Sequence, residues 1–511
     1  MADEKGQTYT VDEALASLGF GKFQVLVLVY AGMGWVSDAM EMMILSFIGP
    51  AVKAKWNLNS NKESLITTVV FAGLLVGSFS WGQVSDRFGR RRGYLVTAFV
   101  TSVAGLLSSF SPNYTSLLVS RFFVGIGLGG VPVLLSYFLE FVPVSNRGAW
   151  MMVFSAFWTV GTILEAVIAW TVMPRLGWRW LLGLSSVPSF LLLLFYFTTP
   201  ESPRYLCLKG RKDDALKIMQ KIARLNGKEL PPGFLVADYE RNQIKADNIP
   251  SKDSESPRHI KDDKHVNSPP TAQDSAMGFV KTFLLLLSPK YLRSTLLLWF
   301  VFFVNSFSYY GLVLLTTELN NSNNRCHSTH SQTAKKSSSS DGVDYVNVFI
   351  ATFAEFPGLL IAALTLDRIG RKLTMAGMFF VAGWFILPLV VPRSPAVTTA
   401  LLFVARMCIN GTFNSIFVYA PEIYPTSVRT TGVGMSSAMG RIGGMVCPLV
   451  AVSLVQGCHE NAAVGLFAGA IFLAGFSVFL FPYETKGRQL VESVSDADHE
   501  IPQDKKPQTE P

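Results

Sequence analysis

Seven charged residues lie inside long apolar stretches of this sequence. They are four carboxylates and three arginines: Asp38, Glu41, Arg121, Glu165, Glu355, Arg406 and Arg441. A charged side chain costs about 2.5–3.5 kcal/mol at the centre of a bilayer by insertion scales, so each one indicates a functional role. Desolvated carboxylates can bind and release protons near neutral pH, and an arginine can bind a carboxylate through two parallel hydrogen bonds.

The carboxylates are candidates for carrying a coupling proton. Asp38 and Glu41 are three residues apart and therefore share one face of a helix, with Trp35 a further three residues back. We expect at least one of the four carboxylates to be a coupling group. The alternative is that they only neutralise buried arginines.

Membrane-spanning helices must position these residues. The chain of 511 residues is 50% hydrophobic and only 16% charged, which is too apolar for a soluble domain of this size. Stretches of about 20 apolar residues can cross the hydrocarbon core as helices. They predict an all-α membrane protein with twelve spans, at 24–48, 64–84, 94–110, 116–138, 149–172, 179–198, 294–316, 344–366, 373–391, 397–419, 433–456 and 462–482.

The distribution of basic residues predicts the orientation. Segment 1–23 is polar and acidic and lacks the pattern of a cleaved signal peptide, so the first span is expected to remain. With both termini in the cytosol, most of the 44 Lys and Arg residues fall on the cytosolic side, as the positive-inside rule requires. The net charge of +8 is thus explained by topology, and no nucleic-acid partner is expected.

Three motifs recur at nearly the same separation, about 282 residues, as an internal duplication requires. "DRFGR" at 86 corresponds to "DRIGR" at 367, the pattern E-x-x-P-x-x-x-R at 140 recurs at 422, and "PESPR" at 200 corresponds to "PYETK" at 482. The chain is therefore expected to contain two six-helix halves of parallel orientation. Arg121 and Arg406 occupy nearly equivalent positions of the repeat, which favours a structural or coupling role over substrate contact.

All of these repeated motifs fall on the predicted cytosolic side. Their carboxylates can pair with arginines at neighbouring helix ends, and we expect such pairs to latch the two halves together on that face and to open when the halves rock apart. The alternative is that the arginines are only topology anchors. The expected gating residues are Asp86, Arg87, Arg90, Glu140, Arg147, Glu201, Arg204, Asp367, Arg368, Arg371, Glu422, Arg429 and Glu484.

The chain resembles major facilitator superfamily transporters over nearly its whole length. "GQVSDRFGRRR", "RFFVGIG", "PESPRYL" and "PYETKGR" are similar to that superfamily's motifs. "GFGKFQ", "FSYYGL" and "PEIYPTSVRTTG" resemble the organic cation/carnitine transporter-like branch and its synaptic-vesicle-glycoprotein relatives, most closely the plant proteins of that branch and the nicotinate transporters. The resemblance implies the major facilitator fold and alternating access around a central cavity.

Arg441 has no charged equivalent in the first half, and this asymmetry points to a substrate. In the organic ion branch, the resemblance implies Asp in this part of the eleventh helix for cation carriers and Arg for anion carriers. A helix–helix ion pair is the alternative role for Arg441. The expected substrate-binding residues are Arg441, Asn305, Tyr309, Tyr310, Trp35, Asn410 and Asn414.

We therefore expect a secondary transporter of a small organic carboxylate or zwitterion, similar to nicotinate or N-methylnicotinate, and driven by protons. An organic cation/carnitine transporter is the first alternative, and a non-transporting membrane receptor or scaffold the second. No enzyme motif is present, and no cofactor is expected besides the proton. A monomer in the plasma membrane is expected, with the vacuole or another organelle as the alternative location.

The loops complete the predicted organisation. The expected domains are a cytosolic N-terminus 1–23, a first half 24–206, a cytosolic linker 207–290, a second half 291–482 and a disordered tail 483–511. The linker is expected to begin with an amphipathic helix and to continue as a disordered segment. Cys326 and Cys458, in two outside loops, could form a disulfide; a metal site with the adjacent histidines and free thiols are the alternatives.

Overall fold

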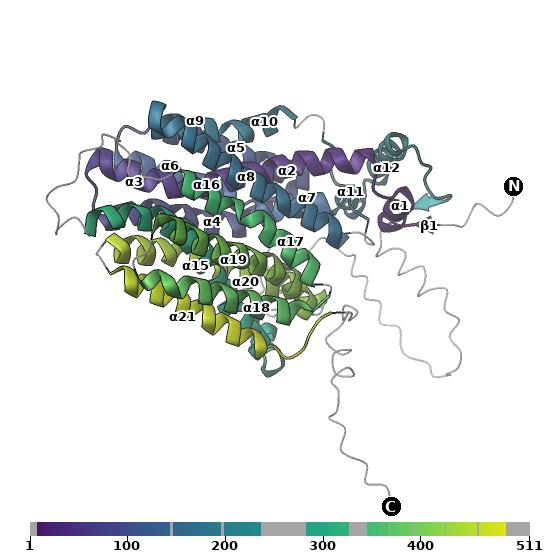
Figure 1. The fold of residues 1–511 in the computed structure, drawn as a ribbon. Coiled ribbons are helices and arrows are strands. Elements are labelled where there is room, and N and C mark those ends of the chain that lie inside the picture. The colour runs from purple at the N-terminus through teal and green to yellow at the C-terminus, as the bar shows by residue number, and fades with distance from the viewer. Residues whose placement is uncertain are drawn as a thin grey trace, which may run out of the picture. The chain divides into compact units, whose positions relative to one another are not determined.

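The computed structural model describes residues 8–143, 147–195, 199–236, 283–326, 345–366, 368–391, 394–424, 426–456 and 459–486. Within these ranges the chain consists of helices, turns and one pair of two-residue strands (Figure 1). Contacts divide the chain into two units. Unit 1 comprises Met1–Ile44, Gly73–Glu165 and Arg179–Pro270, and unit 2 comprises Leu45–Ala72, Ala166–Trp178 and Thr271–Pro511.

The division between the units falls within two long helices, α4 and α8. The elements of the first part of the chain are β1 (Thr8–Tyr9), α1 (Val11–Leu18), α2 (Lys22–Met43), α3 (Leu45–Trp56), α4 (Ser60–Phe88), α5 (Arg90–Ser109), α6 (Tyr114–Leu128), α7 (Val131–Leu139), α8 (Arg147–Leu176), α9 (Trp178–Ser185), α10 (Val187–Phe195), α11 (Pro203–Leu208), α12 (Lys212–Asn226) and β2 (Phe234–Leu235). Unit 2 includes segments of this first part of the chain. The bounds predicted for the two halves, 24–206 and 291–482, therefore stay a prediction.

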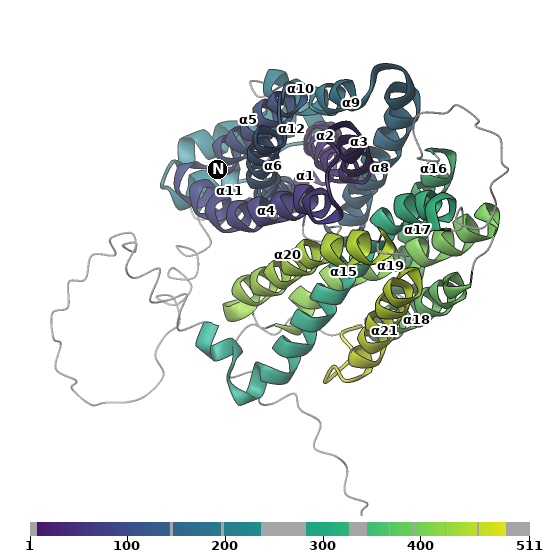
Figure 2. The ribbon, with the colours of Figure 1, turned by 90° about the vertical axis from the view of Figure 1, so that its left-hand side faces the viewer.

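The remaining elements belong to unit 2. They are α15 (Pro289–Cys326), α16 (Tyr345–Phe353), α17 (Glu355–Leu366), α18 (Arg371–Ile386), the 3-10 helix η4 (Leu387–Val390), α19 (Pro395–Ile423), α20 (Thr426–Gln456) and α21 (Glu460–Phe479). In Figure 2, α15 runs beside α20 and α19, and α18 beside α21. The unit is held together by aromatic packing, such as the stacked rings of Phe307 and Phe467 with centroids 4.6 Å apart.

The helices agree with the predicted spans. Within the described ranges, eleven helical stretches are long and apolar enough to cross a membrane, and they coincide with eleven of the twelve predicted spans. The predicted third span, 94–110, lies in α5, a helix of 20 residues. Its first turn contains three arginines and its body several Thr and Ser residues, which lower its mean hydropathy. The expected all-α membrane fold with twelve spans is confirmed.

Small residues allow several helices to pack backbone against backbone. A Cβ added to Gly129, at the junction of α6 and α7, would lie 2.5 Å from the backbone of Gly77 on α4. A Cβ on Gly73, one turn earlier in α4, would likewise meet the backbone of α6 at Phe122. Such contacts are typical of membrane helices, which associate through close van der Waals packing.

A small folded region of unit 1 lies outside the predicted spans, at the N-terminal end of α2 (Figure 1). The strand β1 pairs in parallel with β2, with Tyr9 opposite Leu235. Buried side chains of α1 and α12, among them Leu15 and Met219, share one hydrophobic core with this strand pair. The sequence predicts an amphipathic helix at the start of the linker, and α12 lies there. Leu225, one of the apolar residues at helical spacing, is nevertheless 40% exposed.

Candidate functional site

Two of the charged residues inside the spans form a buried ion pair in unit 1. Arg121 on α6 donates from Nη1 to Oε2 of Glu41 on α2, at 2.9 Å, and both side chains are 0% exposed. Gly105 on α5 leaves room for the pair, since a Cβ there would lie 2.9 Å from Glu41 Oε1. Arg121 therefore neutralises Glu41 at the point where three helices meet.

Glu165 on α8 is also fully buried in unit 1. Its Oε2 atom accepts a hydrogen bond of 2.7 Å from the Ser185 hydroxyl on α9. Glu41 and Arg121 interact with it electrostatically. Three of the expected coupling residues are thus neighbours.

Unit 2 contains a second buried ion pair. Arg406 on α19 donates from Nη2 to Oε1 of Glu355 on α17 at 2.7 Å, and both side chains are at most 1% exposed. The Tyr309 hydroxyl on α15 donates to the same oxygen at 2.8 Å, and the Asn410 amide donates to the Glu355 carbonyl at 2.8 Å. Tyr309 and Asn410, expected to bind substrate, therefore have partners within this network.

Arg441 differs from Arg121 and Arg406 in exposure. It lies within the α20 span and is partly exposed, whereas the other two arginines are fully buried. Its charge interacts with the hydroxyl of Tyr310 on α15. The Tyr310 ring in turn contacts the Phe71 ring of α4 edge to face, with centroids 4.7 Å apart.

The helices α15 and α20 approach closely beside Arg441. A Cβ on Gly440 would lie 2.8 Å from the Ser306 hydroxyl, and one on Gly443 would meet the carbonyl of Phe303. Asn305, next to Ser306, accepts a hydrogen bond of 2.8 Å from Thr412, and its Nδ2 atom has no hydrogen-bond partner among the described residues.

The remaining predicted substrate residues lie in two places. Asn414 on α19 donates to the carbonyl of Asn410 at 2.9 Å. Trp35 on α2 packs between aromatic rings of unit 1, with its centroid 5.4 Å from that of Phe154 and 5.0 Å from that of Trp158. Trp35 therefore has the surroundings of a packed aromatic side chain.

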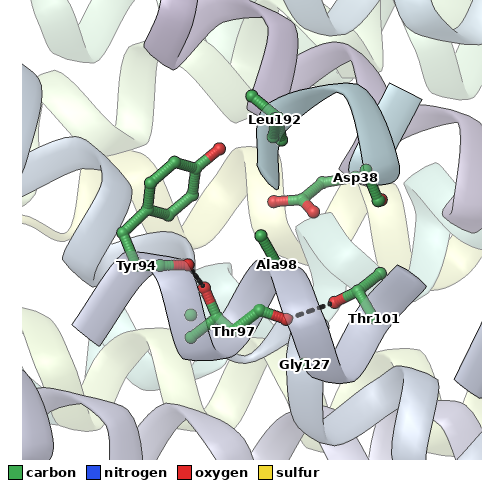
Figure 3. Close-up of a pocket in the computed structure, with 9 residues that line it drawn as sticks. Asp38, Tyr94, Thr97, Ala98, Thr101, Gly127 and Leu192 are labelled. Atoms are coloured by element: carbon green, nitrogen blue, oxygen red, sulfur yellow. Dashed lines mark hydrogen bonds between the residues drawn. The ribbon is translucent and has the colours of Figure 1, made fainter. Parts of the chain in front are cut away.

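Asp38 lies at a small polar cavity of unit 1, formed by α2, α5, α6 and α10. Figure 3 shows its carboxylate and the Tyr94 hydroxyl pointing into the same space. Thr97, Thr101 and Ser189 add further oxygen atoms. The cavity has room for about one water molecule (about 10 Å³). It therefore suits a proton or a water molecule better than an organic substrate.

In unit 1 the repeated motif residues join the ends of neighbouring helices. Arg90, at the start of α5, donates from Nε to Oε1 of Glu140 at 3.0 Å. Glu201 accepts from the backbone N–H of Arg91 at 3.0 Å, so its carboxylate lies at the positive end of the α5 dipole. Arg204 forms an ion pair with Asp12 of α1.

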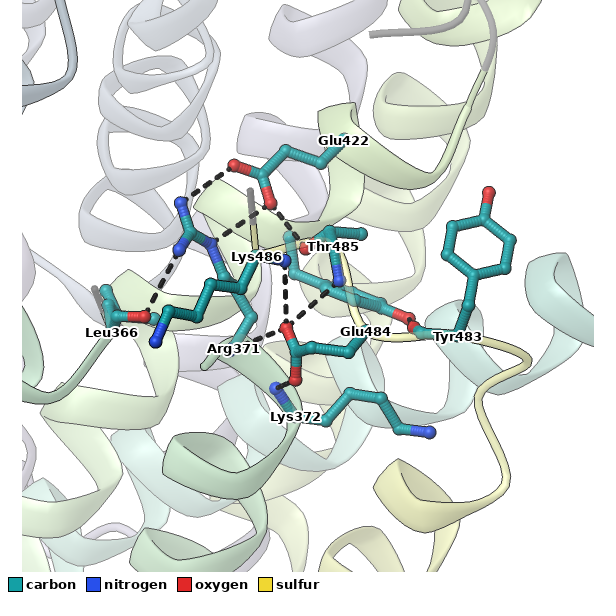
Figure 4. Close-up of polar contacts among 9 residues, drawn as sticks. Leu366, Arg371, Lys372, Glu422, Tyr483, Glu484, Thr485 and Lys486 are labelled. Carbon is teal, nitrogen blue, oxygen red and sulfur yellow. Dashed lines mark hydrogen bonds and ion pairs between the residues drawn. The ribbon is translucent and has the colours of Figure 1, made fainter. Parts of the chain in front are cut away.

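Unit 2 repeats this arrangement (Figure 4). Arg371, at the start of α18, donates to both carboxylate oxygens of Glu422 at 3.2 and 3.3 Å. Glu484 accepts from the backbone N–H groups of Arg371 and Lys372 at 2.8 and 2.9 Å. The Arg368 carbonyl accepts from the Lys486 ammonium at 2.7 Å, just as the Arg87 carbonyl accepts from the Tyr205 hydroxyl at 3.0 Å in unit 1.

The glycine of the repeated motif is required by this geometry. Gly89 and Gly370 have φ of 107° and 108°, a region that other residues rarely adopt. A Cβ on Gly370 would lie 3.0 Å from Glu484 Oε2, and one on Gly89 would collide with the Glu201 carboxylate. The contacts given above lie within unit 1 or within unit 2, and a latch between the halves stays a prediction.

Several predicted residues fall outside the described part of the chain. Asp367 and Cys458 are not described, and the side chains of Asp86, Arg147, Cys326 and Arg429 are not described although these residues lie within helices. The disulfide, its metal-site alternative and the contacts of these gating residues therefore stay predictions.

Sequence reasoning missed partners that are polar but uncharged or distant in sequence. The Ser185 hydroxyl donates a hydrogen bond to Glu165. Asn226 of α12 accepts from the Phe23 N–H at 3.1 Å and donates to Gln24 at 2.9 Å. A serine or asparagine is common in any sequence, so its type alone gives no signal. The helical spacing of α12 could have indicated that Asn226 lies near a buried face.

Comparisons with known proteins agree with this architecture. Residues 33–496 match the family described as "Sugar (and other) transporter". The chain is 58% identical over 502 residues to "Organic cation/carnitine transporter 7" of Arabidopsis thaliana, covering 97% of this chain and 98% of that protein. It is 38% identical over 498 residues to "Synaptic vesicle 2-related protein" of Xenopus laevis, covering 96% and 84%.

Solved structures show the same fold at low sequence identity. The partially occluded inward-open xylose transporter XylE from E. coli has a TM-score of 0.65 and 18% identity, covering 92% of this chain and 100% of that one. The inward-open form has a TM-score of 0.63 and 16% identity, covering 91% and 98%. The family match and the 58% identity to the Arabidopsis transporter show that the chain belongs to the sugar (and other) transporter family of the major facilitator superfamily and is a multi-pass membrane transporter, not an enzyme.

Proposed function

We propose that this transporter moves a small organic carboxylate or zwitterion similar to nicotinate or N-methylnicotinate, and that a proton gradient drives it. The observation that carries the proposal is Arg441, a partly exposed arginine within a membrane span and beside the Tyr310 hydroxyl. A guanidinium group recognises a carboxylate through two parallel hydrogen bonds.

The other two arginines within the spans are less suitable as substrate ligands. Arg121 and Arg406 are at most 1% exposed and each is bound to a carboxylate within 2.9 Å. Removing either from its partner would leave a buried unpaired charge, which costs several kcal/mol. Of these three arginines, Arg441 is the partly exposed one, so an anionic group on the substrate is best assigned to it.

Neighbouring groups in unit 2 can orient a substrate bound at Arg441. The Tyr310 ring offers an apolar face for a planar ring, and its hydroxyl can hydrogen-bond. The Asn305 amide offers a buried donor that no described group uses. Tyr309, Asn410 and Asn414 then act indirectly, because their hydrogen bonds build the network around Glu355.

The name of the Arabidopsis relative favours a second candidate, an organic cation or carnitine. Carnitine carries both a carboxylate and a quaternary ammonium group, so it is compatible with Arg441. A purely cationic substrate would be repelled by the arginine. Asp38, which lines a small polar cavity of unit 1, is in this case a candidate to attract the cation.

The proposal includes the membrane arrangement expected from the sequence. We propose that both termini lie in the cytosol, because the basic loops obey the positive-inside rule. A monomer in the plasma membrane stays the expectation from the sequence. Accessibility of single cysteines introduced into the loops of whole cells tests the orientation.

Uptake into proteoliposomes tests the function. Labelled nicotinate, carnitine and tetraethylammonium are offered with and without an inward proton gradient. We expect nicotinate or carnitine to accumulate with the gradient and tetraethylammonium to be excluded. Tetraethylammonium uptake that exceeds uptake of both carboxylates would refute the proposal.

A further inference from the structure

A cluster of three charged side chains is enclosed within unit 1. Glu41, Arg121 and Glu165 come from α2, α6 and α8, and each is 0% exposed. Glu41 and Arg121 are the charged groups that act on Glu165 from the packed helices, and Ser185 is its hydrogen-bond donor. The cluster is therefore isolated from solvent.

The cluster contains two carboxylates and one guanidinium group. With both carboxylates ionised it would hold a net charge of −1, and burying an unpaired charge costs several kcal/mol. One proton makes the cluster neutral. Since Glu41 is already bound to Arg121, the proton belongs on Glu165.

The corresponding cluster of unit 2 is different. There one carboxylate, Glu355, is matched by one guanidinium, Arg406, and the Tyr309 hydroxyl supplies a further hydrogen bond. This cluster is neutral without a proton. The need for a proton is therefore a property of unit 1, although Arg121 and Arg406 occupy nearly equivalent repeat positions.

The unused hydrogen-bonding atoms of the unit 1 cluster are complementary. Oε1 of Glu165 and Oε1 of Glu41 are buried acceptors without a hydrogen-bond partner among the described residues. Nε and Nη2 of Arg121 are buried donors that also lack a partner there. Buried polar atoms are rarely left unsatisfied. These two donors would let Arg121 bind Glu165 while Nη1 remains on Glu41.

We propose that Glu165 is the proton-binding group of the transport cycle and that Arg121, with Nη1 still on Glu41, also binds Glu165 when the cycle opens the cluster to water and the proton leaves. This proposal rests on the proton-driven transport proposed above. When the cycle opens the cluster to water, a hydronium ion transfers its proton to Glu165 Oε1, which forms an O–H bond, and a water molecule remains. On release the O–H bond breaks, the proton returns to water, and Arg121 binds the ionised carboxylate as well as Glu41.

Infrared difference spectroscopy of the full-length purified protein tests the proton site without any substrate. We expect a C=O stretching band of a protonated carboxyl group that disappears as the pH is raised. Glu165→Gln should abolish this band. Ser185→Ala should move it to higher frequency, because the hydroxyl that donates to the carbonyl oxygen is removed. Glu355→Gln, the matched control from unit 2, should leave it in place.

Transport by the same variants tests the coupling. In proteoliposomes, uptake of nicotinate or carnitine by the Glu165→Gln variant should be equal with and without the gradient. Glu165→Asp, which retains a carboxyl group, should restore part of the stimulation. Counterflow exchange, which needs no net proton movement, shows whether the Glu165→Gln protein is folded.

The outcomes separate the two proposals. A wild-type band that persists in Glu165→Gln, or gradient stimulation that survives this change, overturns the assignment to Glu165. A wild-type protein that lacks gradient stimulation refutes proton-driven transport, whereas the spectra still decide whether Glu165 binds a proton.

Discussion

Replacing Gly370 by alanine tests the repeated motif most sharply. Gly370 has φ of 108° and ψ of 164°, a region that is nearly restricted to glycine and costs other residues about 1–3 kcal/mol. The new Cβ would lie 3.0 Å from both Cδ and Oε2 of Glu484. The carboxylate must then shift away from the N–H groups of Arg371 and Lys372, and hydrogen bonds to charged groups contribute about 1.5–3 kcal/mol each.

We expect Gly370→Ala to lower the free energy of unfolding by about 3 kcal/mol, from the backbone strain and a partial loss of these bonds. Unfolding in mixed detergent micelles measures the change. Gly377→Ala in the same helix is the control, because no atom lies within 4 Å of its added Cβ and alanine should stabilise a helix by up to about 1 kcal/mol. Equal stability of the two variants would refute the reasoning.

Two further changes have expected outcomes. Arg406→Leu should lower the stability of unit 2 by about 3–5 kcal/mol, because Glu355 would lose its ion pair in a buried site. Adding Glu355→Gln to this variant should recover much of the lost stability. An unfolding measurement that finds no recovery would contradict this. Asn226→Ala should cost about 1–3 kcal/mol by removing two hydrogen bonds at the start of α2, whereas Gln220→Ala, at an exposed position of α12, should be neutral in the same assay.

The spans and the repeated motifs could be predicted because their signals are local. About 20 consecutive apolar residues require a membrane helix, and a duplicated motif places its residues at equivalent helix ends. The roles of Arg90 and Arg371 follow from this repetition, since each starts a helix and binds the glutamate of the E-x-x-P motif.

The partners inside the membrane could not be predicted, because they depend on how helices rotate against one another. Asp38 and Glu41 share a helix face, yet Arg121 binds Glu41, while Asp38 lines a separate cavity. Sequence spacing also gives no indication that Thr8 and Tyr9 of the N-terminal segment would pair with Phe234 and Leu235 of the linker, beyond the whole first half.

The central claim is that Arg441 recognises a carboxylate, and competition between nicotinate and nicotinamide tests it most directly. The two compounds differ in that one carries a carboxylate and the other a neutral amide. We predict that nicotinate competes much better than nicotinamide for uptake of the labelled substrate by the wild type, that Arg441→Lys keeps part of this preference, and that Arg441→Gln loses it. A preference for the carboxylate that is unchanged in Arg441→Gln would contradict the account.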